Sequence, residues 1–164
     1  MTDFVTAEVR SKWMSGIGGK NTQPELAVRR QLCDDGFRYR LHVRSVPGTP
    51  DIVLHKFGVC IFVNGCFWHC HRGCAYARVP GTHRSQWELK FARTLVRDAA
   101  VRSTLRAMHW RVIDIWECGI KDVLAPDLTW LGEEIRSGSR KRIQWPAGPR
   151  KRRSIERPHG VDKR

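Results

Sequence analysis

The stretch Val59-Cys-Ile-Phe-Val-Asn-Gly-Cys-Phe-Trp-His-Cys-His-Arg-Gly-Cys74 joins an apolar run to a loop crowded with metal-binding side chains. Residues 59–63 are typical of a short buried strand. The loop then supplies five soft ligands within nine residues, namely Cys66, His69, Cys70, His71 and Cys74. Thiolates and imidazoles are the ligands that zinc prefers, usually four of them in a tetrahedron. The stretch therefore predicts a metal site at the end of a strand.

A zinc site in this loop needs a ligand from elsewhere in the chain. Three loop residues have a spacing short enough to chelate one ion: Cys66, His71 and Cys74. The best-placed fourth ligand is Cys118, at the end of a later predicted strand. Cys70 can replace either loop cysteine, so the spacing leaves that choice open. A closed site of four protein ligands is structural, and it leaves His69 free for other work.

The rest of the chain alternates between helical and strand-like patterns. Thr22-Gln-Pro-Glu25 is typical of a capping box that starts a helix, and the alternation of apolar and basic residues at 37–44 is typical of a strand. The expected elements are a helix at 23–35, a strand at 37–44, a hairpin of strands 51–54 and 59–63, a helix at 84–108, a strand at 110–116 and a helix at 126–136. This order predicts an α/β domain with a central mixed β-sheet flanked by helices.

Positive charge is concentrated at the end of the chain. The 164 residues carry a formal net charge of +14, and from residue 136 onward eleven Lys/Arg against two acidic residues give +9. We therefore expect an N-terminal arm at 1–20, a folded domain at 21–136 and a basic tail at 137–164 that is mobile without a ligand. This charge favours a polyanionic partner, most simply nucleic acid, through neutralisation of its phosphates.

The sequence lacks the patterns of membrane insertion and secretion. No apolar run approaches the length of about 20 residues that spans a bilayer, and the N-terminus lacks the layout of a secretory signal. Cysteines of a protein that is not secreted stay reduced or bind metal. The expectation is a soluble, cytoplasmic protein with no membrane partner.

Three side chains are candidates for catalysis, and each has a structural alternative. Asp51 opens a predicted strand and can seat Mg²⁺, which prefers oxygen ligands, or it is an ordinary turn aspartate after Pro50. His69 can act as a general base near neutral pH, or it is a zinc ligand or a buried histidine. Glu25 can assist the waters of a metal site, although the capping box explains it without any chemistry.

Large aromatic side chains lie near these candidates. Phe67 and Trp68 belong to the ligand-rich loop, and Trp87 lies near the start of the long predicted helix. Apolar wedges of this kind can enter a base step and distort a DNA duplex. Trp87 is explained more simply as part of the helix core. Phe67 and Trp68 are harder to assign to a core.

Five sequence motifs in this order resemble one enzyme family. They are T-Q-P-E, P-G-T-P-D, F-V-N-G-C-F-W-H, W-x2-K-F and W-x-V-I-x-I-W-E-C, spread over roughly residues 8–120. The combination resembles the very-short-patch-repair (Vsr) DNA mismatch endonucleases. The resemblance implies a restriction-endonuclease-like α/β fold with a structural zinc site. It also implies a Mg²⁺-dependent nick in one strand of duplex DNA next to the thymine of a T·G mismatch, which arises when 5-methylcytosine deaminates.

The resemblance also assigns roles to individual residues. It implies that Mg²⁺ is bound by Asp51 and the backbone carbonyl of Val63, that His69 is the general base, and that Glu25 supports the waters around the metal. It implies that the zinc ligands are Cys66, His71, Cys74 and Cys118. It further implies that the aromatic side chains inserted into DNA are Phe67, Trp68 and Trp87.

Two other functions remain alternatives, and the sequence departs from the family pattern in places. A restriction-type nuclease of the same fold is disfavoured because Phe62-Val63-Asn64 stands where such enzymes have E-x-K. The second alternative is a non-catalytic, zinc-stabilised DNA-binding module. Asn64 stands where the family often has histidine or aspartate, and Thr94 where it usually has asparagine. We expect a monomer in the bacterial cytoplasm that acts at the nucleoid, with downstream repair proteins as further partners.

Overall fold

The computed structural model describes residues 19–121, 123 and 126–148. These contain the helices α2 (Gln23–Asp34), α3 (Arg84–Ala107) and α4 (Trp130–Ser137), and the strands β1 (Arg40–Leu41), β2 (Ile52–Leu54), β3 (Val59–Asn64), β4 (Arg111–Trp116) and β5 (Arg142–Trp145). Short 3-10 turns follow β2 and β4, at His55–Phe57 and Glu117–Gly119. Nearly all of the expected N-terminal arm, and residues 149–164 of the expected tail, lie outside the described residues.

The five strands form one mixed sheet in the order β1-β2-β3-β4-β5. β1, β2 and β3 are antiparallel neighbours, whereas β4 runs parallel to β3 and β5 runs parallel to β4. The central strands β3 and β4 consist largely of buried residues, as expected for parallel strands covered on both faces. The predicted α/β class, with a mixed central sheet flanked by helices, is confirmed.

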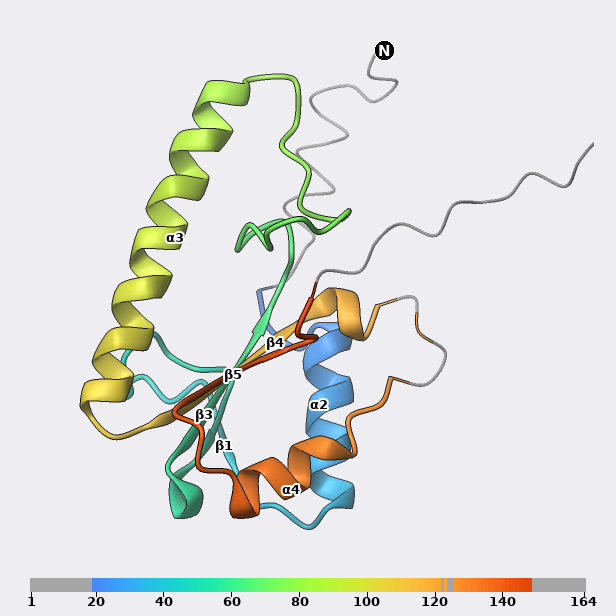
Figure 1. Cartoon of the computed structure of the whole chain (residues 1–164), viewed down its shortest axis with the longest axis vertical. Coiled ribbons are helices and arrows are strands. Elements are labelled where there is room, and N and C mark those ends of the chain that lie inside the picture. Colours follow the sequence, from blue (N-terminus) through green and yellow to red (C-terminus); the bar gives the residue numbers. More distant parts are fainter. Residues whose placement is uncertain (1–18, 122, 124–125, 149–164) are drawn as a thin grey trace, which may run out of the picture.

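Helices cover the two faces of the sheet, and the alternation of side chains along the strands explains why. Ile61 and Ile113 point to a core shared with α2 and α4, and their neighbours Phe62 and Val112 point to a core shared with the end of α3. Figure 1 shows the resulting three layers, with α3 on one side of the sheet and α2 and α4 on the other. Within the described residues, no helix is both long and apolar enough to span a membrane.

The start of α2 is a capping box, as predicted. Thr22 is the N-cap, and its hydroxyl accepts a hydrogen bond from the amide of Glu25 (3.4 Å). The Glu25 carboxylate in turn accepts one from the amide of Asn21, the residue before the N-cap (3.0 Å), so the returning bond of the box reaches one residue further back than in its usual form. The helix ends at Asp34, and Gly36 follows in a left-handed conformation (φ +76°) that suits glycine.

Helix α3 spans nearly the predicted range, but its predicted apolar stripe is only partly buried. Leu105 and Phe91 are buried, whereas Leu95 and Met108 are 48% and 50% exposed. The N-terminal half of α3 extends past the sheet and runs beside the loop that joins it to β3 (Figure 1). The helix therefore packs on the sheet at one end and on the loop at the other.

Three predicted elements need correction. Only Arg40–Leu41 of the predicted strand 37–44 is β-structure, because His42 adopts a left-handed backbone (φ +47°) and the chain then turns. The last helix begins at Trp130 rather than at 126. The tail was predicted to be mobile from residue 137, and that was wrong for Arg142–Trp145, which pairs with β4 as strand β5. The division into arm, domain and tail otherwise stays a prediction.

Candidate active site and metal cluster

Four buried side chains gather into a group that could hold a metal ion. They are the four ligands expected from the sequence, and their ligand atoms all lie within 4.8 Å of one another: Cys66, His71, Cys74 and Cys118. Nδ1 of His71 is 3.4 Å from Sγ of both Cys66 and Cys118. Three thiols and one imidazole are a donor set that suits zinc. Cys70, which the spacing left open, is not part of this group.

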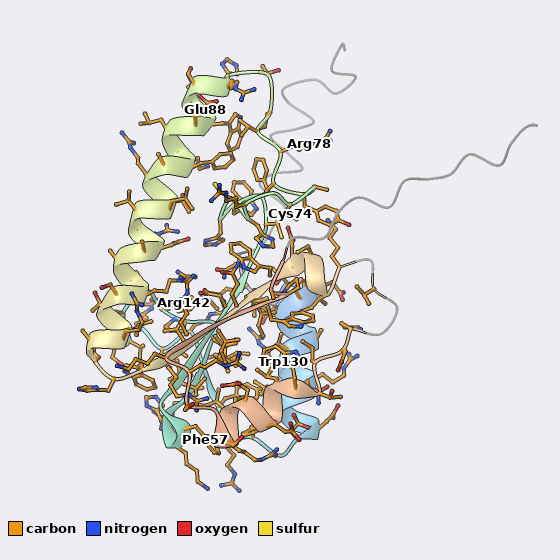
Figure 2. The ribbon with its side chains drawn as sticks, viewed as in Figure 1. Phe57, Cys74, Arg78, Glu88, Trp130 and Arg142 are labelled. Carbon is orange, nitrogen blue, oxygen red and sulfur yellow. The ribbon has the colours of Figure 1, made fainter. Side chains whose placement is uncertain are left out.

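The sheet explains how ligands distant in sequence meet. β3 and β4 are parallel, so the residues that follow them emerge at the same edge. Cys66 follows β3, and Cys118 lies in the turn after β4. The loop folds back through a hydrogen bond from the amide of His71 to the carbonyl of Cys66 (2.9 Å), which brings Cys74 to this edge (Figure 2). His71 also stacks on Trp116, with ring centroids 4.1 Å apart.

Burial favours the neutral forms of Cys66 and His71 when no cation is present. It raises the pKa of the Cys66 thiol well above its usual value, with Cys118 and Cys74 adding to the effect, and it lowers the pKa of His71. A bound cation reverses this preference for the thiols because a thiolate is stabilised by a neighbouring positive charge. The cluster could therefore hold a cation, which would stabilise thiolates that burial otherwise disfavours.

A cleft of about 490 Å³ lies next to this cluster. It brings together the sequence candidates Glu25, Asp51, Val63 and His69, from α2, the start of β2, β3 and the loop. Trp68 and Glu117 line the same cleft. Glu117 was not a candidate from sequence, but it follows β4 directly, and its carboxylate accepts a hydrogen bond from the amide of Cys66 (2.8 Å). One carboxylate thus joins the cleft to the metal cluster.

Asp51 is held against the neighbouring strand. Its Oδ2 accepts a hydrogen bond from the amide of Val63 (2.7 Å), and its Oδ1 lies 3.9 Å from Nδ1 of His42. Burial raises the pKa of the Asp51 carboxyl, which the Val63 hydrogen bond opposes, and the nearby Glu25 raises it further. Two acidic groups in one partly buried cleft favour a bound cation, and carboxylates suit Mg²⁺.

Glu25 both caps α2 and lines the cleft. It is 3% exposed, in the cleft that contains Asp51. Arg29 forms an ion pair with Glu25 (2.8 Å) and approaches Nε2 of His42 (3.3 Å). The cap and the arginine fix the position of the Glu25 carboxylate, so the structural role and a role in the cleft are compatible.

Asp98 is a residue of the site that the sequence reasoning missed. Its Oδ2 lies 2.5 Å from Nδ1 of His69, across the gap between α3 and the loop. Burial alone would raise the pKa of Asp98, but the hydrogen bond and charge of His69, with Arg97 and Arg102, lower it. A carboxylate at Nδ1 holds the proton on that nitrogen, which leaves Nε2 to accept one. The only acidic residues in α3 are Glu88 and Asp98. Their scarcity in a basic helix was the one sequence feature that could have pointed to Asp98.

The aromatic candidates form one cluster beside the cleft. The ring centroid of Phe67 is 5.1 Å from that of Trp68 and 5.2 Å from those of Trp87 and Phe91. The ammonium group of Lys90 lies 5.1 Å from the ring centroids of both tryptophans. Phe91 was not predicted as part of this group. The loop and the N-terminal half of α3 thus present partly buried aromatic rings together with a positive charge.

Asn64, a departure from the family pattern, has a structural partner. It is 2% exposed, its amide donates to Asp114 (3.1 Å), and its carbonyl accepts from Arg102 (3.2 Å). Asp114 is fully buried in β4 and also binds Arg102 and Arg142. Asn64 therefore belongs to a buried polar network under α3.

Comparisons with known proteins agree with this site. A family model described as DNA mismatch endonuclease Vsr matches residues 2–75. Type II nicking enzyme V.XorIIP of Xanthomonas oryzae pv. oryzae is 41% identical over 123 residues, which are 75% of this chain and 90% of that protein. Type II nicking enzyme V.NmeAIP of Neisseria meningitidis serogroup A is 38% identical over 122 residues, 74% of this chain and 86% of that protein. DNA mismatch endonuclease Vsr of Escherichia coli K12 is 35% identical over 121 residues, 74% of this chain and 77% of that protein.

A carboxylate-lined cleft beside a cysteine–histidine cluster, in a chain with these relatives, defines a DNA endonuclease. The chain belongs to the family of Vsr DNA mismatch endonucleases. The resemblance noted from sequence motifs alone is thereby confirmed.

Proposed function

We propose that the chain nicks one strand of duplex DNA next to the thymine of a T·G mismatch and so initiates very short patch repair. The observation that carries this proposal is that Glu25, Asp51 and His69 line one cleft, with Trp68 of the aromatic cluster at the same cleft. A cleft with acidic groups and a histidine suits phosphodiester hydrolysis, and aromatic rings beside it suit a distorted duplex.

In the proposed mechanism, the aromatic cluster partly unstacks the mismatched step. A T·G wobble pair deforms more easily than a Watson–Crick pair, so this unstacking costs less at a mismatch than in fully paired DNA. His69, held at Nδ1 by Asp98, takes a proton from the attacking water. Mg²⁺ held by Asp51 and the backbone carbonyl of Val63 would polarise the phosphate and stabilise the leaving oxygen. Glu25 supplies a second carboxylate for the waters of the cleft.

The cysteine–histidine cluster has a structural role in this proposal. Zn²⁺ bound by all four ligands would have no open position, so it would stabilise the loop rather than take part in chemistry. His69 lies in the sequence between two of these ligands. We place the protein in the bacterial cytoplasm as a monomer, with mismatched duplex DNA as its main partner and downstream repair proteins as further partners.

The test is cleavage of end-labelled duplexes that carry T·G, other single mismatches or full pairing, in varied flanks, with and without Mg²⁺. The expected result is a Mg²⁺-dependent nick in the thymine strand alone, lost in Asp51→Asn. Cleavage of fully paired DNA at least as fast would favour a restriction-type or sequence-directed nicking enzyme. Binding without cleavage in every flank would favour a DNA-binding module.

A further inference from the structure

A second cavity, of about 240 Å³, adjoins His69 and Asp98. It lies between α3 and the sheet, and its polar lining includes Arg102 and Arg106 of α3 and Arg142 of β5. Arg142 lies in the space between β5 and α3 (Figure 2). The volume is several times the share of about 30 Å³ that one water takes in the liquid, so the cavity has room for a small polyatomic ligand.

The carboxylates at this cavity are already engaged. Asp114 accepts hydrogen bonds from Asn64 (3.1 Å), from Arg102 (Nε, 3.0 Å) and from Arg142 (3.0 Å). Asp98 accepts from His69 (2.5 Å) and from two nitrogens of Arg97. These acceptors have their partners within the protein, so a ligand that needs acceptors would find few at this cavity.

Hydrogen-bond donors, in contrast, remain available. Arg106 uses only Nε, which donates to the carbonyl of Arg102 (3.3 Å), and within the described part of the chain its terminal nitrogens have no partner. Arg142 directs Nε and one terminal nitrogen at Asp114, and its side chain is still 46% exposed.

The charges of the lining side chains also favour an anionic ligand. Three guanidinium groups face two carboxylates at this cavity, which leaves an excess of positive charge. Arginines bind tetrahedral oxyanions through several charge-assisted hydrogen bonds. We propose that this cavity is an oxyanion site for a phosphate group. The phosphate comes either from the backbone of bound DNA or from free phosphate in solution.

The first experiment measures binding of inorganic phosphate to the full-length protein at constant ionic strength, by calorimetry and by thermal shift. Phosphate should raise the melting temperature saturably because it binds the folded state. Arg106→Gln/Arg142→Gln should weaken phosphate binding about tenfold or more for each arginine, as for a lost hydrogen bond between charged groups. The control Arg84→Gln/Arg93→Gln removes the same charge from exposed positions of α3 that do not line the cavity, and it should bind phosphate like the wild type.

A second arm separates the two sources. A neutral methylphosphonate is placed at each backbone position of a mismatched duplex in turn. If DNA supplies the phosphate, a methylphosphonate at one position will weaken binding of the duplex to the wild type and to the control. It will not weaken binding to Arg106→Gln/Arg142→Gln, the cavity variant. If free phosphate is the ligand, no position will show this coupling. Neither measurement needs cleavage, so the outcome is separate from that of the proposed nicking activity.

The proposal is overturned if phosphate binds the cavity variant as tightly as the wild type and no methylphosphonate position is coupled to it. Should the double variant fold poorly because Arg142 also neutralises Asp114, Arg106→Gln alone repeats both arms. Arg106 is exposed, and among the described residues its side chain bonds only to a carbonyl of its own helix. Its replacement therefore tests the cavity with little effect on the fold.

Discussion

Nδ1 of His69 and Oδ2 of Asp98 lie 2.5 Å apart, although the two residues come from a loop and a helix that are 29 positions apart in sequence. This contact ties the middle of α3 to the cleft that His69 and Asp51 line. It also connects His69, through Asp98 and Arg102, to the buried Asp114 of the central strand β4. The orientation of the histidine thus depends on how α3 packs against the sheet.

Replacement of Asp98 by asparagine should slow nicking about 10²-fold or more, because the ring loses the partner that fixes its tautomer. Affinity for a mismatched duplex should change little. The measurement is a single-turnover nicking rate across pH, together with a binding isotherm. Glu88→Gln removes the other acidic residue of α3 from an exposed position and should keep the wild-type rate. Equal rates for the Asp98 variant and the wild type would refute the positioning role.

Asp51→Asn should remove Mg²⁺-dependent nicking while making the metal-free protein more stable near neutral pH. Burial raises the folded-state pKa of Asp51 above its ordinary 3.8, so ionisation of this carboxyl disfavours the fold. Stability of the wild type therefore falls as pH rises from about 3.8 through the folded-state value. Asparagine keeps an acceptor for the amide of Val63 without the charge. Thermal melts at several pH values, with and without Mg²⁺, check both parts.

Loss of metal from the cysteine–histidine cluster should destabilise the loop and abolish nicking. Elemental analysis of the purified protein should give one zinc per chain, and Cys118→Ser should lose it, because structural sites need all four ligands. The Tm of this variant should fall by several degrees or more. Cys33→Ser changes an exposed cysteine outside the cluster and serves as the control. A Cys118→Ser protein with full zinc content would contradict the assignment of this ligand.

Asp114→Ala should be among the most destabilising single changes in the sheet. It leaves the buried guanidinium of Arg102 without its main partner, and breaking a buried ion pair on one side costs about 3–5 kcal/mol. Urea denaturation gives the free energy of unfolding. Glu133→Ala, at an exposed position of α4, should change it by less than about 0.5 kcal/mol.

Trp68→Ala should weaken binding to a T·G duplex by about 1–3 kcal/mol, the range found for stacking of a base on an aromatic side chain. The effect on paired DNA should be smaller, because that duplex resists unstacking. Fluorescence of 2-aminopurine beside the mismatch reports the unstacking directly. Leu89→Ala alters an exposed apolar residue of the same helix as Trp87 and should leave the signal unchanged. Identical losses on both duplexes would contradict a wedge specific to the mismatch.

The parts of the fold predicted from sequence are those with strong local signals. The apolar runs of β3 and β4 and the long pattern of α3 define the central layers because burial on both faces demands them. The four cluster ligands were found because metal chemistry restricts their spacing. Strand β5 gave no such signal, since it has only four residues, which alternate between exposed and partly buried positions. Arg142 of β5 contacts the buried Asp114 of β4, a partner that local patterns do not reveal.

The contacts that position the candidate site were the hardest to predict. Asp98 is one polar residue in a polar helix, and only the packing of α3 brings it to His69. The alternation at 37–44 suggested a strand, but the left-handed backbone at His42 bends the chain away and brings that histidine towards Asp51. In both cases the tertiary structure overrides a local pattern.

The cluster ligands come from both sides of the β3–α3–β4 connection: Cys66, His71 and Cys74 precede α3, and Cys118 follows it. In the folded chain, the fourth ligand lies beside the others because the pairing of β4 with β3 places both strand ends at one edge. A metal ion held by all four ligands would therefore cross-link the loop that carries His69 to the end of β4, and so to the central sheet.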